Sequence, residues 1–459
     1  MALEDRFGLP LSTSDPGAAG DYVAAVDLML SANTGAETLL DRALAADPEF
    51  ALARIAKARL CQVQARVPEA KQAAADARSL DARVTPREAR HIETIALAID
   101  GNGPQAMALL EGHIADYPRD AMVLSLALGV FGLLGFSGRI DHHEAQLALL
   151  EREARHWGED WWFLTYLGWA RIELGDIVRG AAEVERALAG NPRNAYAAHA
   201  RTHGYFEAGE ADAGAAFIDS WLPGYDRASQ LHAHLSWHLA LFELARGNPD
   251  RARELYGDAI RPSVSQAPPL FNLADAASFL WRWQLYGAGQ GLDGWPEVAT
   301  HARQYFPQAG IHFADVHAAL AEGATDDHDS AERRIGQSRV RLESGRLPQG
   351  AVVPELCAGA AAFARGDYAA AVARLGAALP ELRRIGGSHA QREVFEDTFV
   401  VACLRAGEHD KAAACLEARL ARRPSARDKR WLAEAKAVSA GTNSAKLLFC
   451  LRNEIMCRS

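Results

Sequence analysis

Residues 161–194, WWFLTYLGWARIELGDIVRGAAEVERALAGNPRN, decide the fold. Counted from Trp161, Leu-Gly stands at positions 7 and 8, Gly-Asp at 15 and 16, and Gly, Ala and Pro at 20, 27 and 32. A helix–turn–helix repeat with a period of about 34 residues carries these residue types at these positions. The stretch therefore predicts the two helices of one repeat unit, and the next unit starts at Ala195.

The same punctuation recurs along the chain. Units that start at Gly17 and Arg87 keep the small residues, the leucine and the proline of the pattern. A further unit runs from Ala121 through Gly135, with Asp141 as the expected N-cap of its second helix. We therefore predict an all-α fold, an α-solenoid or superhelix of tetratricopeptide-like helix pairs.

The expected organisation has three parts. Residues 1–16 are an N-terminal lead-in, residues 17–438 form the superhelix, and residues 439–459 form either a C-terminal capping helix or a non-native tail. In the second half we expect non-helical connections at 261–269 and 287–294, and helical units at 309–345 and from Val352. The last unit starts at Glu393, or upstream at Ser388 after a Gly-Gly turn.

Composition excludes several classes of function. The formal net charge is -10 and the chain has no basic run, which argues against a nucleic-acid or membrane-surface partner. No apolar stretch is long enough to span a bilayer, and the charged amino terminus does not resemble a secretory signal, so we expect a cytoplasmic protein. The six cysteines form no CxxC pair, so neither a zinc knot nor a disulfide framework is indicated.

Four histidines share one register in two neighbouring repeats. His199 and His203 fall at positions 5 and 9 of the unit from Ala195, and His234 and His238 at positions 2 and 6 of the next. In such repeats these positions line the concave face, where ligand-binding side chains usually lie. Each pair is spaced i, i+4 and so shares one helical face. A packed or solvated helix surface is the plain alternative for each of them.

Further polar residues lie on the predicted first helices of later units. The segment 272–283 carries an aspartate and an arginine, the segment 313–317 an aspartate and a histidine, and the segment 388–393 a histidine and an arginine. A solenoid that curls on itself can bring such residues together across its axis. These residues are Asp275, Arg282, Asp315, His317, His389 and Arg392.

Three segments identify a resemblance. QLHAHLSWHLALFEL from Gln230, FADVHAAL from Phe313 and GGSHAQREVF from Gly386 resemble the tetratricopeptide repeat protein 38 family, and the likeness runs over most of the chain. The resemblance implies an all-helical superhelix and no particular activity. The positions it marks as family-like are His232, His234, His238, Asp315, His317, His389 and Arg392.

Three interpretations of the site stay open. In the first, His199, His203, His234 and His238 hold a divalent metal such as zinc, although neither HxxxH contains the glutamate of a zincin. In the second, an aspartate orients a histidine for acid–base chemistry of a hydrolase or lyase type. Asp315 and His317 point apart on a helix, so that pair must come from different helices. In the third, the chain is a non-enzymatic protein–protein interaction scaffold that binds a peptide in its groove, without the Lys and Arg of a carboxylate clamp.

The first two interpretations share one prediction, a concave site that binds and transforms a small polar molecule. The expected catalytic residues are His234, His238, Asp275, Asp315, His317 and His389. The expected substrate-binding residues are His199, His203, His232, Trp281, Arg282 and Arg392. The expected partner is a small-molecule ligand or a peptide in the groove.

Overall fold

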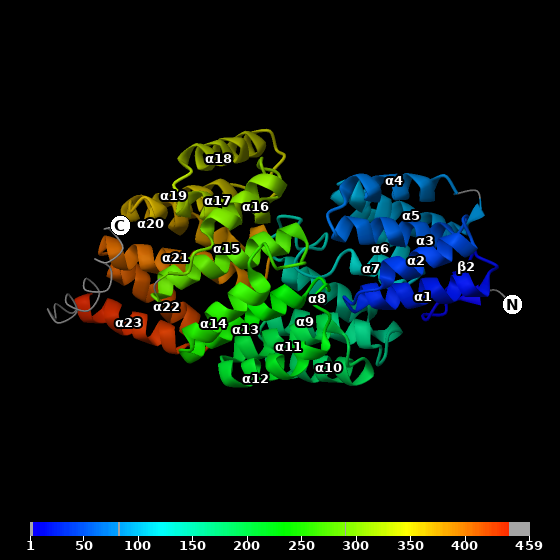
Figure 1. The fold of residues 1–459 in the computed structure, drawn as a ribbon, viewed down its shortest axis with the longest axis horizontal. Coiled ribbons are helices and arrows are strands. Elements are labelled where there is room, and N and C mark those ends of the chain that lie inside the picture. Colours follow the sequence, from blue (N-terminus) through cyan, green and yellow to red (C-terminus); the bar gives the residue numbers. More distant parts are fainter. Residues whose placement is uncertain (1–2, 81–82, 290, 440–459) are drawn as a thin grey trace. The chain divides into compact units, whose positions relative to one another are not determined.

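The computed structural model describes residues 3–80, 83–289 and 291–439, and nearly all of its regular structure is α-helix. The chain divides into two compact units. Unit 1 comprises residues 1–204, 221–233 and 266–269, and unit 2 comprises residues 205–220, 234–265 and 270–459. The fold is therefore all-α, as predicted, and it is built of tetratricopeptide-like helix pairs (Figure 1). Residues 440–459, where a capping helix or a non-native tail is expected, lie outside the described residues.

Unit 1 begins with a two-stranded antiparallel hairpin that pairs Leu3 with Leu11. Helices that follow one another in the chain then pack together: α1 contacts α2, α3 contacts α4, and α5 contacts α6. The elements are β1 (Leu3–Glu4), β2 (Pro10–Leu11), α1 (Pro16–Leu30), α2 (Ala36–Ala46), α3 (Ala51–Val63), α4 (Val67–Arg78), α5 (Pro86–Ile99), α6 (Gly103–Asp116), α7 (Ala121–Ser125), α8 (His142–Glu153), η2 (Ala154–His156), α9 (Trp161–Glu173) and α10 (Ile177–Gly190).

The chain passes between the units within α11 (Ala195–Ala208), α12 (Ala211–Trp221) and α13 (His232–Arg246), and again around the start of α15 (Pro269–Tyr286). The short η3 (Leu222–Gly224) follows α12. Unit 2 continues with α14 (Pro249–Leu255), the π-helical η4 (Tyr256–Ile260), α15 (Pro269–Tyr286), α16 (Trp295–Tyr305), α17 (His312–Ala324), α18 (His328–Glu343), α19 (Val352–Ala364), α20 (Tyr368–Ala378), η5 (Leu379–Ile385), α21 (His389–Ala406), α22 (His409–Arg422) and α23 (Ala426–Ser439).

The pair α9–α10 shows why the decisive stretch folds as it does. The Asp160 carboxylate caps α9 by accepting hydrogen bonds from the backbone N–H groups of Trp162 and Phe163. The two helices then meet at Gly168 and Gly180, where a Cβ on Gly168 would lie 2.6 Å from the Gly180 carbonyl oxygen. Positions 8 and 20 of the repeat therefore need glycine here, because the backbones touch.

The unit predicted from Ala121 differs from the pattern in its first helix. Helix α7 ends at Ser125, and residues 126–141 form turns before α8 begins. Two glycines in this segment, Gly129 and Gly138, adopt a φ of +79°, which other residues rarely adopt. Asp141 is the N-cap residue of α8, as predicted, but its carboxylate pairs with Arg139 and does not cap the helix.

In unit 2 several predicted boundaries match the structure. Helix α19 begins at Val352, and Ser388 caps α21 in a capping box with Gln391. The predicted connection at 287–294 contains no α-helix among its described residues, and the one at 261–269 contains none before its last residue, Pro269, where α15 begins. No helix in the described part of the chain is both long and apolar enough to cross a membrane.

Candidate functional site

The strongest candidate site in unit 2 is a buried imidazole–carboxylate pair. His234 on α13 donates from Nδ1 to Asp275 on α15, at 2.9 Å to Oδ1 and 3.0 Å to Oδ2. Both side chains are about 2% exposed. Burial raises the pKa of Asp275, and the neighbouring His234 and Arg282 partly offset that rise. The carboxylate thus orients the imidazole, as an orienting group does for a general base.

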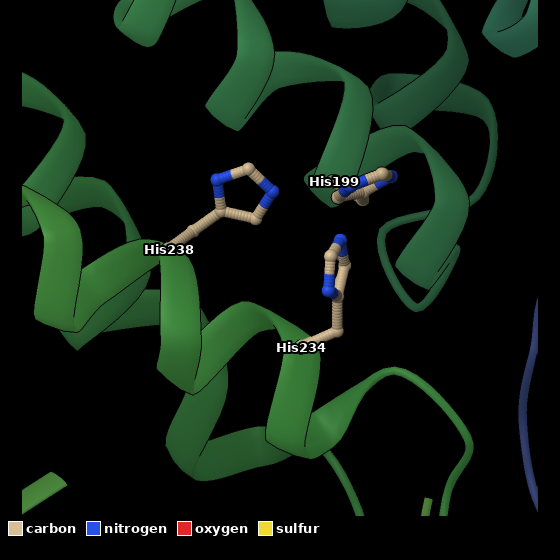
Figure 2. A group of neighbouring side chains, drawn as sticks. All are labelled: His199, His234 and His238. Atoms are coloured by element: carbon tan, nitrogen blue, oxygen red, sulfur yellow. The ribbon is translucent and has the colours of Figure 1, made fainter. Parts of the chain in front are cut away.

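His238 stands one turn further along the same helix. Figure 2 shows His234 and His238 rising from successive turns of α13 on one side of that helix, and it also labels His199 of unit 1. The two rings of α13 have centroids 4.8 Å apart and are nearly perpendicular. The His234 ring also stacks on Trp237, with 5.2 Å between centroids. Packing as well as hydrogen bonding therefore holds these imidazoles in place.

Ser278, one turn after Asp275, is not arranged as a nucleophile. Its hydroxyl accepts a hydrogen bond from Trp237 Nε1 at 3.1 Å and donates to the Asp275 carbonyl at 3.3 Å. Both contacts place the serine in helix packing. Ser278 therefore does not act as a nucleophile beside the His234–Asp275 pair.

Two predicted substrate-binding residues of α15 connect it to α21. Arg282 Nη2 donates to the Ala390 carbonyl at 2.6 Å, and its guanidinium lies over the Trp237 ring. Trp281 Nε1 donates to Thr398 Oγ1 at 2.9 Å. Both side chains are buried, so these contacts serve the packing of unit 2.

Asp315 and His317 do not pair with each other, as predicted from their spacing. Asp315 accepts from Arg334 Nη1 at 2.8 Å, and burial raises its pKa to about 6. His317 Nδ1 donates to the Phe313 carbonyl at 2.7 Å, and burial lowers the pKa of this imidazole to about 4. His317 is therefore neutral at pH 7 and hydrogen-bonded within its own helix.

The remaining predicted residues of unit 2 lie at the start of α21. His389 Nδ1 lies 3.2 Å from the Glu207 carboxylate. The buried Arg392 donates to the carbonyls of Gly386 and Gly387 in the turn that precedes the helix. Arg392 therefore stabilises the turn through neutral acceptors.

In unit 1 the pair His199 and His203 converges. Their Nε2 atoms are 3.0 Å apart, and His203 Nδ1 lies 2.8 Å from Glu173 Oε1. His232, also in unit 1, stacks at 6.4 Å on Tyr225, and burial lowers the pKa of its imidazole. The four predicted metal ligands thus fall in two i, i+4 pairs, one in each unit.

An open hollow lies on unit 2 at the helix turns around α12 and α14. It has a volume of about 640 Å³ and is lined by residues 209–213, Ala245, Arg246 and Asn248. Gly209 in its wall has a φ of +72°, and a Cβ there would lie 2.6 Å from the Pro424 carbonyl oxygen. We call this feature the α12–α14 hollow. None of its lining residues was predicted from the sequence.

A second group of residues, a buried histidine–aspartate cluster in unit 1, was also not predicted from the sequence. His91, His113 and Asp120 of unit 1 bring three potential ligand atoms together in its interior. One signal was available: His91 is the fifth residue of the unit from Arg87, the repeat position that His199 occupies in its own unit.

No protein-family model matches the chain. Among solved structures, human IFIT1 in a dimer with PPP-AAAA is 13% identical, with a TM-score of 0.42, over 100% of this chain and 98% of that one. A tetratricopeptide repeat protein from Parabacteroides merdae is 13% identical, with a TM-score of 0.29, over 76% and 98%. Yeast Tom70 is 13% identical, with a TM-score of 0.33, over 92% and 88%. Similarities of this size support no functional conclusion.

Proposed function

We propose that this chain is a non-enzymatic interaction scaffold of tetratricopeptide-like helix pairs that binds a peptide segment of a partner protein. One observation carries the proposal: the α12–α14 hollow is open to solvent, whereas the His234–Asp275 pair, the best candidate for catalysis, is buried. A substrate needs access to a base, but an interaction scaffold needs only a shaped and exposed surface.

The chemistry of the hollow favours a basic partner. Glu210 and Asp212 are exposed in its lining, and the Asp212 side chain is 90% exposed. The one cationic residue of the lining, Arg246, already pairs with Asp212 and with the buried Glu243. Together with the chain's formal charge of -10, this arrangement favours a peptide that carries Lys or Arg. The hollow, with a volume of about 640 Å³, is large enough to hold a few side chains of an extended peptide.

A fluorescent-peptide screen tests the proposal. Basic, acidic and apolar peptides of equal length are titrated with the full chain, and we expect saturable binding of the basic class alone. The double variant Glu210→Lys/Asp212→Lys should lose that binding. Asp329→Lys is the matched control, because Asp329 is also an exposed acid in the first turn of a helix but lies outside the hollow. Equal binding of all three classes, or none, would contradict the proposal.

A second candidate function rests on the His234–Asp275 pair. In this alternative, His234 acts as a general base on a small polar molecule, in a reaction of the hydrolase or lyase type, with or without a divalent metal at the predicted histidines. The support is the 2.9 Å contact between Nδ1 and Oδ1 in the interior of unit 2. His234→Gln should then abolish turnover of small esters, amides or hydroxy acids, while His301→Gln on α16 should not. Membership of the tetratricopeptide repeat protein 38 family remains a prediction, and neither function is drawn from it.

A further inference from the structure

The histidine–aspartate cluster of unit 1 draws on three separate elements. His91 lies on α5, His113 on α6, and Asp120 is the N-cap residue of α7. The Asp120 Oδ2 atom lies 2.8 Å from His91 Nδ1 and 3.0 Å from His113 Nε2. All three side chains are nine-tenths or more buried. Two imidazole nitrogens and one carboxylate oxygen therefore meet at one point inside the unit.

We propose that His91, His113 and Asp120 form a binding site for one divalent transition-metal ion, with zinc the best match to this donor set. Imidazole nitrogen and carboxylate oxygen are ligands that zinc takes in proteins, whereas calcium and magnesium prefer oxygen alone. Bonds of about 2.0–2.1 Å in a tetrahedral site separate neighbouring ligand atoms by about 3.3 Å. The observed 2.8 and 3.0 Å separations need to widen by only a few tenths of an ångström.

The surroundings of Asp120 hold its carboxylate in position. Arg87 Nη1 donates to Oδ2 at 3.1 Å, and the Val123 backbone N–H donates to Oδ1 at 3.3 Å. Arg87 in turn donates from Nη2 to the Pro10 carbonyl in β2, at 2.8 Å. Outer contacts of this kind orient metal ligands. Because the guanidinium is itself cationic, it lowers the affinity for a second cation, and we expect weaker binding than at a site without it.

A small cavity lies next to the cluster. His91 and Asp120 form part of its wall with Asp5, Tyr22 and Arg87. Its volume of about 10 Å³ is close to the least space that one water molecule needs. A water ligand there would complete a tetrahedral site. The ion would then connect α5, α6 and the start of α7, and through Arg87 also the N-terminal hairpin, so its role is to stabilise unit 1.

Hydrogen bonds alone are the competing explanation for the same geometry. In that case each imidazole donates its inner N–H to Asp120, and the carboxylate is neutralised by Arg87. The outer nitrogens, His91 Nε2 and His113 Nδ1, have no hydrogen-bond partner among the described residues. No outer contact there fixes the tautomer, so the inner nitrogens can present lone pairs to a metal ion once the proton moves outward.

Cobalt and zinc titrations of the full chain distinguish the two explanations. The protein is stripped with a chelator and dialysed against each metal, and bound metal is counted per chain while the visible absorption of cobalt is recorded. We expect His113→Gln to bind one equivalent less than the unaltered chain, and His312→Gln, a buried histidine of unit 2, to lose none. The result is the difference in bound metal between the unaltered chain and each variant, so metal bound at the other histidine pairs does not affect it.

A measurement on the unaltered chain keeps the test decisive if His113→Gln does not fold. Hydrogen exchange is followed by mass spectrometry with and without zinc, and the proposal predicts slower exchange in α5, α6 and α7 when zinc is present. Equal metal content in His113→Gln and His312→Gln would overturn the proposal. So would exchange in these three helices that zinc leaves unchanged.

Discussion

His234 and Asp275 are 41 residues apart in the chain, yet the imidazole Nδ1 lies 2.9 Å from the carboxylate Oδ1 in the interior of unit 2. The two residues lie on α13 and α15, and each provides a hydrogen-bond partner for the other in a buried position. Such a pair stabilises one arrangement of α13 and α15, because a buried polar group without its partner is costly.

Asp275→Ala should therefore destabilise unit 2 although it removes no large apolar side chain. We expect a loss of about 2–4 kcal/mol, because His234 would lose its acceptor in a buried position. Asp275→Asn keeps an acceptor oxygen for Nδ1–H and should cost less than half as much. Urea unfolding of the three proteins gives the comparison. Equal stability of the alanine and asparagine variants would show that the hydrogen bond matters little.

Close approach of the backbones at Gly168 predicts a steric effect. Gly168→Ala should destabilise the chain by about 1–3 kcal/mol, because the new methyl group would meet the Gly180 carbonyl and the α9–α10 pair must separate. Gly112→Ala on α6 is the matched control: a Cβ there meets nothing within 4 Å, so the change should stabilise by about 0.5–1 kcal/mol through helix propensity. Thermal unfolding measures both shifts, and a loss in both variants would refute the steric explanation.

The buried His317 predicts a pH dependence with a definite sign. Its pKa falls from 6.5 to about 4 on folding, so the unfolded chain binds a proton there that the folded chain does not. The stability it contributes is fully present above pH 6.5 and is lost as the pH falls towards 4, by about 3 kcal/mol for a shift of this size. The difference in unfolding free energy between the unaltered chain and His317→Gln should shrink over that range. A difference that is independent of pH would contradict the assignment.

Arg419 stands in the centre of a buried ion-pair network in unit 2. It contacts Asp397 at 2.8 Å, Asp428 at 3.0 Å and Glu393 at 3.1 Å. Arg419→Met should cost about 3–5 kcal/mol, because it leaves buried carboxylates with less compensating charge. Arg374→Met, which breaks the partly exposed pair with Glu355, should cost about 0–1 kcal/mol. Chemical unfolding in low salt compares the two, and similar losses would contradict the assigned role of burial.

The repeat period made much of the fold predictable from sequence. Gly168 and Gly180 identify a helix pair because their spacing reflects a contact between neighbouring helices, and the Ser388–Gln391 capping box acts over three residues. The break after Ser125 was not predicted, since helical periodicity continues through it and the positive φ angles of Gly129 and Gly138 in the segment that follows are not visible in the pattern. Local sequence patterns therefore predicted the regular helices better than they predicted the irregular segment after Ser125.

The candidate site was less predictable for a physical reason. The register identified His234 and His238 as neighbours on one helix face, because i, i+4 spacing is a local property. Which carboxylate would reach them depends on packing between helices: Asp275 contacts His234, whereas Asp315 contacts Arg334. The burial of His234 and His238 was the least predictable property, because the sequence pattern alone could not distinguish an open groove from a packed interior.

The measurement that tests the central claim most directly is calorimetric titration of the full chain with the best basic peptide from the screen. The scaffold account predicts one site per chain, weaker binding at high salt and at least a tenfold loss in Glu210→Lys/Asp212→Lys, with the peptide recovered intact. Undiminished binding by that variant would contradict it. So would chemical conversion of the ligand that disappears in His234→Gln, since that result would make the His234–Asp275 pair an active site.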